Sequence, residues 1–525
     1  MAKKTTTVKE IRKKEKEPIG FDLDANVPAK YLNLSVIGLI IVIFLIFLSP
    51  LFFQGKIFQS GDIIASESAT SYLQKARTGF TLWNPHIFTG MPAYALSVGY
   101  TWFNLIYVAL TSIRELFVWV FGNDFVRWAF YLIVLGITTF YLMKMLTKNT
   151  MVSLFSSLAT ALSTGLVVFL YIGHVTKLTS LAFFPVIFLI LLRNQQKFRL
   201  IDFFILTIAL QLIVQGFHVQ IIFYILFTVG IFFLFYITRS LIIKDNGLLK
   251  TTVKSALLFT GASLIAIGIQ ADNLTQIYEY TPHSTRGTAS ILDKSAQSGG
   301  EEDKSKNSEY YKYHTDWSFS PGEVMTFIIP SWYGFGNSDQ IINGEKYKLN
   351  TYFGQMPFVD VAMYMGVLVF FLALFGMVSR WREPFVMFLT ILTSIALLIS
   401  FGRNFPLFFD LLFNYFPNFD KFRVPSMILV IPQMVMPILA GLGLMKIVEL
   451  GKEKNVTWEK VIMGIAGVSS VLFVFSLLGR SGMISWVSNR FALSEKAAQY
   501  PKEAISIVGN AAGEMFANDA IINFL

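Results

Sequence analysis

The chain has no cysteine among its 525 residues, and only 14% of its residues are charged. The absence of cysteine excludes disulfide bonds and thiol redox chemistry, so packing has to hold any ordered loop in place. Soluble domains carry charge on about a quarter of their residues, whereas 54% of this chain is hydrophobic. The composition therefore indicates an integral membrane protein.

The sequence also lacks features that would divide it or remove part of it. No fixed-period repeat is present, and no Gly/Ser-rich or Pro-rich linker separates two soluble domains. The first apolar run, 34–53, exceeds the roughly 7–15-residue core of a cleavable signal, and no A-x-A-type cleavage motif follows it. We therefore predict a permanent anchor there and one membrane domain over residues 34–480.

The apolar residues gather in long runs. About 20 residues of helix cross the roughly 30 Å of a bilayer's hydrocarbon core, and runs of this length recur along most of the chain. The sequence predicts an all-α polytopic membrane protein, a multi-span helical bundle with about eleven transmembrane helices. They are predicted at 34–53, 125–145, 150–171, 177–192, 200–215, 219–238, 255–271, 359–379, 384–401, 425–446 and 461–479.

The formal net charge of +10 is spread over short loops rather than gathered in one basic domain, so nucleic acid is not an expected partner. An excess of Lys and Arg marks the cytoplasmic loops of a membrane protein. The N-terminal segment 1–33 is a basic tail that contains Lys3, Lys9 and Arg12. We therefore predict a cytoplasmic N-terminus, with a tail that has no fixed structure.

Alternation of the loops places three long segments on the outer face: 54–124, 272–358 and 402–424. The second contains a polar insert, 293–313, which its Ser, Lys and Glu content predicts to be mobile. After the last span, 481–525 is predicted to be an outer-face segment that is too short to bury a sizeable core alone. This segment is also expected to be shortened relative to natural relatives.

The first outer segment carries the acidic motif Ser60-Gly61-Asp62. Loops beyond roughly 12–15 residues are uncommon unless they carry function or are disordered. Two roles are open for Asp62: a general base that accepts a proton from a sugar hydroxyl, or the N-cap of a helix that starts at Ile63. Glu67 does not share a helical face with Asp62, so it is predicted to support a site rather than to catalyse.

The same segment contains Trp83-Asn84-Pro85 and Gly90-Met91-Pro92, which predict a compact turn with Trp83 anchored at the lipid headgroups. His86 lies in this turn, and His174 lies in a short outer loop. Zinc needs four ligands at suitable spacing, and neither histidine has such partners nearby in the sequence. No metal and no other cofactor is therefore predicted.

Basic residues on the predicted outer elements are candidates for binding a phosphate. His174 and Lys177 can bind the phosphate of a lipid carrier, although Lys177 can instead snorkel to water. Arg286 lies between small residues, a context that suits forked contacts with phosphate. Arg423 can pair either with Asp420 or with a phosphate.

Several of these motifs, in this order, resemble the YfhO family of bacterial membrane proteins. The resemblance covers about residues 34–450. It is carried by Gly61-Asp62, Trp83-Asn84-Pro85 with Gly90-Met91-Pro92, Gly173-His174 followed by Lys177, Ser284-Thr285-Arg286-Gly287, Pro321-Gly322-Glu323 with Ile329-Pro330, and Phe422-Arg423-Val424-Pro425-Ser426.

This family is similar to the GT-C glycosyltransferase superfamily. The resemblance implies a GT-C-like bundle in the bacterial cytoplasmic (inner) membrane, catalysis on the outer face, and a polyprenyl-phosphate sugar as donor. It also implies an acidic catalytic residue in the first outer loop, which is Asp62 here. The chain departs from the paired acidic motif of many GT-C proteins, because Asp62 has no acidic neighbour before Glu67.

The function expected from these residues is transfer of a sugar from a polyprenyl-phosphate carrier to an envelope glycan, lipid or protein acceptor. Asp62 would be the base, and His174, Lys177, Arg286 and Arg423 would bind the donor phosphate. Glu67, Trp83 and Glu323 are expected to support the site, Glu323 by capping or orienting its own segment. Two alternatives stay open: a transporter or flippase of lipid or polysaccharide, and a non-catalytic envelope assembly factor.

Overall fold

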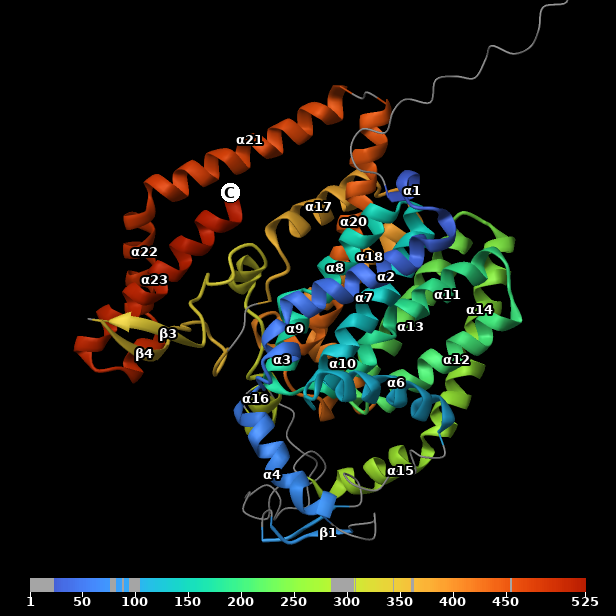
Figure 1. The fold of residues 1–525 in the computed structure, drawn as a ribbon, viewed down its shortest axis with the longest axis horizontal. Coiled ribbons are helices and arrows are strands. Elements are labelled where there is room, and N and C mark those ends of the chain that lie inside the picture. The colour runs from blue at the N-terminus through green and yellow to red at the C-terminus, as the bar shows by residue number, and fades with distance from the viewer. Residues whose placement is uncertain are drawn as a thin grey trace, which may run out of the picture.

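The computed structural model describes residues 23–75, 82–86, 89–93, 104–284, 306, 308–342, 344–359, 363–453 and 456–525. These residues fold mainly into helices, with two short β-hairpins (Figure 1). Seven of the described helices are long and apolar enough to cross a membrane, or eight if one bent pair forms a single span. The chain is an all-α polytopic membrane protein, as predicted.

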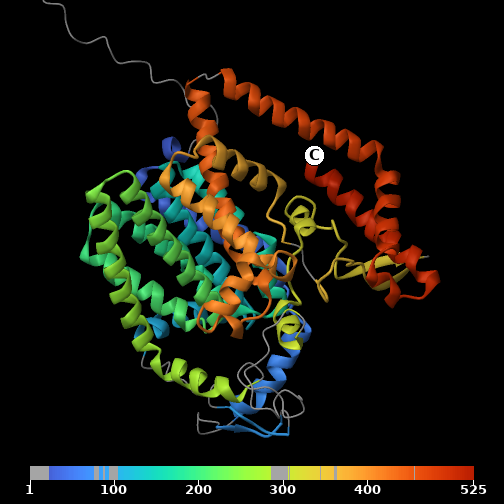
Figure 2. The same cartoon turned by 180° about the vertical axis from the view of Figure 1, so that it is seen from behind.

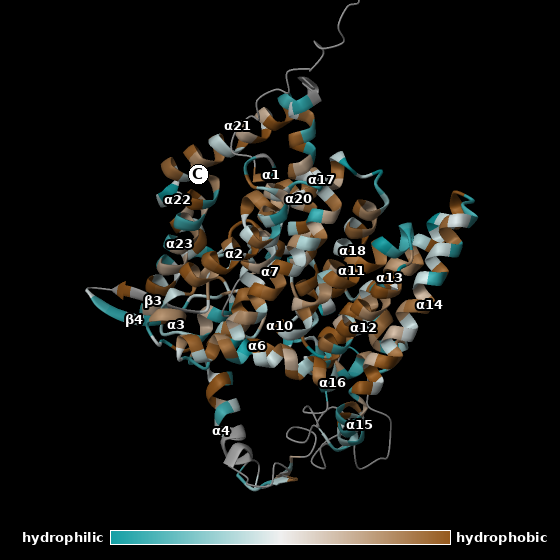
Figure 3. Cartoon of the chain, turned by 45° about the vertical axis from the view of Figure 1, so that its right-hand side comes forward, coloured by the Kyte–Doolittle hydropathy of each residue, from teal (hydrophilic) through white to brown (hydrophobic). Residues whose placement is uncertain are grey.

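The long helices correspond to predicted spans, and α10 and α11 count together as one crossing. Figure 3 shows apolar residues along these helices and polar residues near many of their ends. The long helices are α2 (Ala29–Phe47), α7 (Val126–Thr147), α10 (Val175–Ala182) with α11 (Phe184–Gln196), α13 (Val219–Ile242), α14 (Asn246–Ile269), α20 (Val430–Glu453) and α21 (Val456–Leu478). The bent pair, with an angle of 42°, is α8 (Thr150–Ala161) and α9 (Thr164–Ile172).

Three further apolar helices fall on predicted spans but are shorter than the roughly 20 residues of a straight crossing. They are α12 (Leu200–Gln215), α17 (Val367–Ser379) and α18 (Pro384–Ser400). The total of about eleven spans therefore stays a prediction.

The remaining elements flank the bundle. The elements α4, β1 and α15 lie at its lower end in Figure 1, whereas α1 lies near its upper end. The outer segment 54–124 contains α6, a helix that the sequence analysis did not predict. The bounds are α1 (Leu23–Asn26), α3 (Ser49–Phe53), α4 (Gly61–Lys75), β1 (Trp83–Asn84), β2 (Met91–Pro92), α6 (Leu105–Phe121), α15 (Ala271–Tyr280), α16 (Glu309–Thr315), β3 (Asn337–Ile342), β4 (Glu345–Asn350), α19 (Pro406–Tyr415), α22 (Arg480–Ala492) and α23 (Lys502–Phe524).

Glycine lets two bundle helices touch. A Cβ at Gly376 of α17 would lie 2.4 Å from the Leu439 carbonyl oxygen, and one at Gly443 of α20 would lie 2.2 Å from the Leu372 carbonyl oxygen. Membrane helices associate through such close packing because lipid provides no hydrophobic force that drives them together. This contact holds α17 against the most deeply buried span, α20.

The N-terminal tail is partly ordered, which corrects the expectation that 1–33 has no fixed structure. Helix α2 begins at Ala29, and α1 precedes it. Asp24 accepts a hydrogen bond from Lys144 Nζ at 2.7 Å and another from the Thr150 backbone N–H at 2.8 Å. The carboxylate therefore ties this end of the tail to the α7–α8 connection.

The C-terminal helices α22 and α23 build a second hydrophobic core together with the 329–353 segment. Val487, Phe491, Val508 and Phe516 are buried there against residues of the 329–353 segment. The 481–525 segment thus buries its core together with another part of the chain. This agrees with the prediction that it is too short to bury a sizeable core alone.

The Arg490 guanidinium reinforces the shared core. It lies 4.6 Å from the ring centroid of Trp486, 4.8 Å from that of Tyr333 and 5.3 Å from that of Phe353. Partly desolvated cation–π contacts of this kind contribute roughly 1–2 kcal/mol each. The guanidinium therefore links α22 to the 329–353 segment.

Helix α21 stands away from the main bundle and leads to α22 and α23, as Figures 1 and 2 show from opposite sides. Only 6% of the residues in its apolar stretch are buried. Met463, Val471 and Leu478 are exposed. An apolar helix with this exposure suits a lipid environment.

A buried ion pair generates the first prediction. Arg193 Nη2, in the last turn of α11, lies 3.0 Å from Asp202 Oδ1 in the first turn of α12, and the Asp202 side chain is 0% exposed. Arg193→Ala leaves the buried Asp202 carboxylate unpaired, so we expect the unfolding free energy to fall by about 3–5 kcal/mol. Thermal unfolding of the purified protein in detergent measures the change.

The matched control is Asp124→Ala. Asp124 is largely exposed and pairs with Arg127 at 2.9 Å, so its loss should cost less than about 1 kcal/mol. Equal melting temperatures for the two variants would show that the Arg193–Asp202 pair does not stabilise the α11–α12 junction.

Candidate functional site

The site starts at the first turn of α4. Ser60 Oγ accepts a hydrogen bond from the Ile63 backbone N–H at 3.3 Å, so Ser60 is the N-cap of this helix. The interpretation of Asp62 as the cap is wrong. Asp62 lies in the first turn, where the helix dipole favours negative charge, and its side chain is 69% exposed.

Glycine brings this turn against the membrane bundle. Gly173 ends α9 with φ +82°, a left-handed conformation that favours glycine. A Cβ at Gly173 would lie 2.5 Å from Ile63 Cγ1, and the Ile63 side chain is buried. The contact places Asp62 beside His174, the residue that follows Gly173.

Three side chains form a hydrogen-bonded chain. Lys177 Nζ lies 2.9 Å from His174 Nδ1, and His174 Nε2 lies 3.0 Å from Asp62 Oδ2. A lysine ammonium can only donate, so His174 Nδ1 accepts from it. The proton on the neutral imidazole is then on Nε2, which donates to the Asp62 carboxylate.

Electrostatics favours this neutral form. Burial, and next the positive charge of Lys177, lower the pKa of His174 to about 4, against the opposing effect of Asp62. The imidazole is therefore uncharged at neutral pH. It fixes Oδ2 of Asp62, while Oδ1 has no hydrogen-bond partner within the described part of the chain.

Lys177 is buried in the helical bundle. The residue is only 5% exposed, and its ammonium lies 4.9 Å from the centroid of the Phe169 ring. The side chain does not snorkel to water. Its ammonium bonds to His174, through which Lys177 orients Asp62. The binding of a donor phosphate by His174 and Lys177 stays a prediction.

The turn between β1 and β2 lies beyond α4. Trp83 pairs with Pro92 and Asn84 pairs with Met91 in an antiparallel hairpin, which confirms the predicted compact turn. The exposed Trp83 ring covers Gly90, where a Cβ would lie 2.4 Å from Cζ2.

His86 and Glu67, two further residues considered in the sequence analysis, also lie in this part of the chain. Asn84 Oδ1 accepts a hydrogen bond from the His86 backbone N–H at 3.0 Å. Glu67 is exposed on α4. The supporting role expected of Glu67 and Trp83 stays a prediction.

Arg423 lies in the turn that precedes α20. Its Nη1 donates to Tyr313 Oη at 2.7 Å, and its guanidinium lies 4.7 Å from the centroid of Tyr313 and 5.0 Å from that of Trp317. Asp420 pairs with Lys421 at 3.6 Å, so the predicted Arg423–Asp420 alternative is wrong. Among the described residues, no carboxylate lies within ion-pair distance of the Arg423 guanidinium.

The backbone next to Arg423 is strained. Val424 has φ +62°, a left-handed conformation that is an outlier for a β-branched residue and costs of order 1–3 kcal/mol. Gln220 Nε2 donates to the Arg423 carbonyl at 2.8 Å, and the Ser426 N–H donates to the Trp317 carbonyl at 3.1 Å. Such strain is often found at functional sites.

The turn before α13 connects the two clusters. A Cβ at Gly216 would lie 2.8 Å from the Thr176 carbonyl oxygen, next to Lys177 in α10. Gln220, four residues later, holds the Arg423 carbonyl. The short segment 216–220 therefore contacts both α10, which carries Lys177, and the Arg423 turn.

Glu323 is a structural residue. It closes a capping box with Ser320, whose backbone N–H donates to Oε2 at 2.6 Å, and Tyr352 Oη donates to Oε1 at 2.6 Å. Burial raises the pKa of this carboxyl above its usual value. The predicted capping role is confirmed.

Two predictions concern ligands, a phosphate on Arg286 and the absence of a bound metal. Arg286 lies outside the described residues, so its role as a phosphate ligand stays a prediction. In the described part of the chain, no group of three His, Asp or Glu side chains gathers that would hold a metal ion.

The sequence analysis missed the aromatic neighbours of Arg423. Tyr313 ends the segment 293–313, which was predicted to be mobile, but α16 is helical from Glu309 to Thr315 and Tyr311 is buried. The spacing of Tyr310, Tyr313 and Trp317, at three and four residues, was a helical signal inside that polar segment.

No family model, no curated protein and no solved structure matches this chain. The resemblance to the YfhO family therefore stays a prediction. The case for a function depends on the geometry of the site.

The depressed pKa of His174 predicts a pH dependence of stability. In the unfolded chain the imidazole titrates near 6.5, whereas in the folded chain its pKa is about 4. Between these values the unfolded state binds more protons, so this contribution to stability is lost as the pH falls from about 6.5 to about 4.

Melting temperatures at about pH 7 and about pH 5 test this difference. We expect His174→Gln to lose less stability between the two pH values than the wild type. The control His283→Gln, which replaces an exposed histidine, should keep the wild-type dependence. A His174→Gln variant with an unchanged dependence would refute the assignment of a half-buried neutral imidazole.

Proposed function

We propose that the chain is a membrane glycosyltransferase that moves a sugar from a polyprenyl-phosphate carrier to an acceptor hydroxyl, with Asp62 as general base. One observation carries the proposal. The exposed Asp62 carboxylate is oriented through one oxygen by the neutral His174, while its other oxygen has no partner among the described residues.

The proposed step balances as a single displacement. The acceptor hydroxyl oxygen bonds to the anomeric carbon, Asp62 Oδ1 takes the hydroxyl proton, and the bond from the anomeric carbon to the phosphate oxygen breaks. The lipid phosphate leaves with the electron pair, and the configuration at the anomeric carbon inverts. A positioned base of this kind is typically worth about 10²–10⁴-fold in rate.

Arg423 supports the proposal as the group that binds the donor phosphate. Its guanidinium is held by aromatic rings rather than by a carboxylate, so its charge is available to an anion. Guanidinium groups suit forked contacts with phosphate oxygens, and cation–π contacts leave the in-plane N–H groups for such bonds. In the proposal Arg286 is a second phosphate ligand.

The proposed setting follows the sequence: a GT-C-like bundle of about eleven spans in a bacterial cytoplasmic membrane, with the N-terminus in the cytoplasm and the site on the outer face. The lower end of the bundle, where α4 and β1 lie in Figure 1, is then the outer end. The acceptor is an envelope glycan, lipid or protein.

A transporter or flippase is the second candidate, favoured by one observation. Lys177 is buried near the end of an apolar span, and titratable residues inside membrane spans often mark ion or proton pathways. The chain Lys177–His174–Asp62 would then carry protons. Proton uptake into proteoliposomes that is coupled to transport of a lipid or polysaccharide, without sugar transfer, would favour the transporter.

Asp62→Asn tests the proposed base. We expect sugar transfer from radiolabelled polyprenyl-phosphate sugars to membrane acceptors to fall about 10²–10⁴-fold, because an amide cannot accept the proton. The variant keeps the size of the side chain and an oxygen that can accept the bond from His174. Labelling at matched expression measures the loss.

The control for this experiment is Asp124→Asn, which removes an exposed carboxylate outside the site. It should keep wild-type labelling. Equal labelling by wild type and Asp62→Asn would remove Asp62 as the base. Labelling by none of the proteins with any donor would contradict the proposed transferase activity.

Arg423→Gln tests the phosphate contact. Hydrogen bonds to charged groups contribute about 1.5–3 kcal/mol, so we expect KM for the donor to rise roughly 10–100-fold. Arg423→Lys keeps the charge but loses the forked geometry, and an intermediate KM is expected. An unchanged KM in both variants would exclude Arg423 from donor binding.

A further inference from the structure

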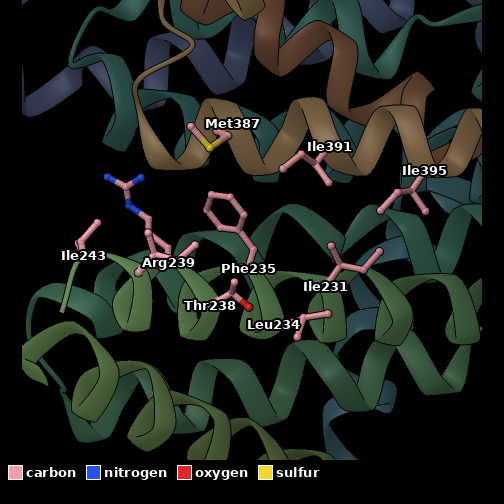
Figure 4. A pocket seen from close by; sticks show the side chains of 10 residues that line it. Ile231, Leu234, Phe235, Thr238, Arg239, Ile243, Met387, Ile391 and Ile395 are labelled. Carbon is pink, nitrogen blue, oxygen red and sulfur yellow. The ribbon is translucent and has the colours of Figure 1, made fainter. Parts of the chain in front are cut away.

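An apolar groove runs between α13 and α18, far along the chain from the Asp62 site. Its volume is about 440 Å³, within the roughly 300–1,000 Å³ range of ligand pockets. Figure 4 shows α18 side chains on one wall and α13 side chains on the other. The lining residues are Ile231, Leu234, Phe235, Thr238, Arg239, Ile242, Ile243, Met387, Ile391 and Ile395.

The groove is suited to a hydrocarbon chain. Its lining is almost entirely apolar, and both walls belong to apolar helices. Leu234 and Ile391 are exposed at its rim, so the groove opens toward the surface that lipid covers in a membrane. An acyl chain can therefore enter from the side without crossing a polar surface.

One end of the groove is charged. Figure 4 shows Arg239 at the end that Met387 also lines, opposite the end formed by Ile231 and Ile395. Within the described part of the chain, no carboxylate lies within ion-pair distance of the Arg239 guanidinium. A cation without a counter-ion at the end of an apolar groove complements a lipid with an anionic headgroup.

The surrounding residues indicate that this end lies at the membrane–water interface. Arg239 lies in the last turn of α13, and Met387 lies in the first turns of α18. Trp381, just before α18, is exposed, and the Arg382 guanidinium lies 5.7 Å from the centroid of its ring. Trp and Arg are the usual residues at the level of lipid headgroups.

We propose that this groove binds an anionic membrane phospholipid, with one acyl chain between α13 and α18 and the headgroup phosphate on Arg239. The site is separate from the proposed donor site, and it does not depend on the proposed transferase activity. A bound lipid would fill the space between these two apolar helices.

Native mass spectrometry of the full chain in detergent tests the proposal, with phosphatidylglycerol and phosphatidylcholine as probes. We expect tighter binding of phosphatidylglycerol in the wild type, and about a tenfold weaker affinity in Arg239→Gln because a charge-assisted bond is lost. The control Lys148→Gln removes an exposed cation elsewhere and should bind as the wild type does.

A second variant separates the groove from the charge. Ile391→Trp fills the groove while keeping Arg239, so binding of both lipids at this site should fall. Equal affinity for the two lipids in the wild type, or unchanged phosphatidylglycerol binding in both Arg239→Gln and Ile391→Trp, would overturn the proposal. A second copy of the chain bound in place of lipid, seen as a dimer mass that Ile391→Trp abolishes, would also overturn it.

Discussion

A buried ammonium group needs a hydrogen-bond acceptor, and in this chain the acceptor for Lys177 is His174. This one bond decides the state of the site. It fixes which imidazole nitrogen carries the proton, and the proton then lies on the side of Asp62. The exposed Asp62 carboxylate, at the end of a membrane bundle, is in this way oriented by the buried ammonium group of Lys177.

Close backbone packing makes that bond possible. Gly173 allows Ile63 of α4 to lie against the α9–α10 turn, and Gly216 brings the α12–α13 turn against α10. Without a hydrophobic driving force between helices in lipid, small residues at contacts of this kind hold the spans together. The same residues that let the bundle pack therefore also place its charged side chains.

The sequence predicted the long spans because a chain in lipid has to satisfy its backbone hydrogen bonds within each helix, and apolar runs of the right length report this directly. It also predicted the compact turn at Trp83 and the capping role of Glu323, which depend on local turn chemistry. It could not predict that Asp62 meets His174, 112 residues away. That contact depends on tertiary packing at Gly173. Asp is also a favoured N-cap residue, and the sequence alone did not show that Ser60 caps this helix instead. The aromatic neighbours of Arg423 were missed because the many charged and polar residues of segment 293–313 predicted a mobile segment. The helical spacing of its aromatic residues was too short a pattern to change that prediction.

The separation of α21 and the C-terminal helices from the bundle has a consequence for how the chain unfolds. Val487, Phe491 and Phe516 belong to a hydrophobic core distinct from that of the spans, and α21 connects the two with little burial of its own. Domains with separate cores open as separate cooperative units. Hydrogen exchange of α22 and α23 should then follow the loop around Trp332 and Phe353 rather than the spanning helices. This C-terminal unit can therefore open while the membrane bundle remains intact.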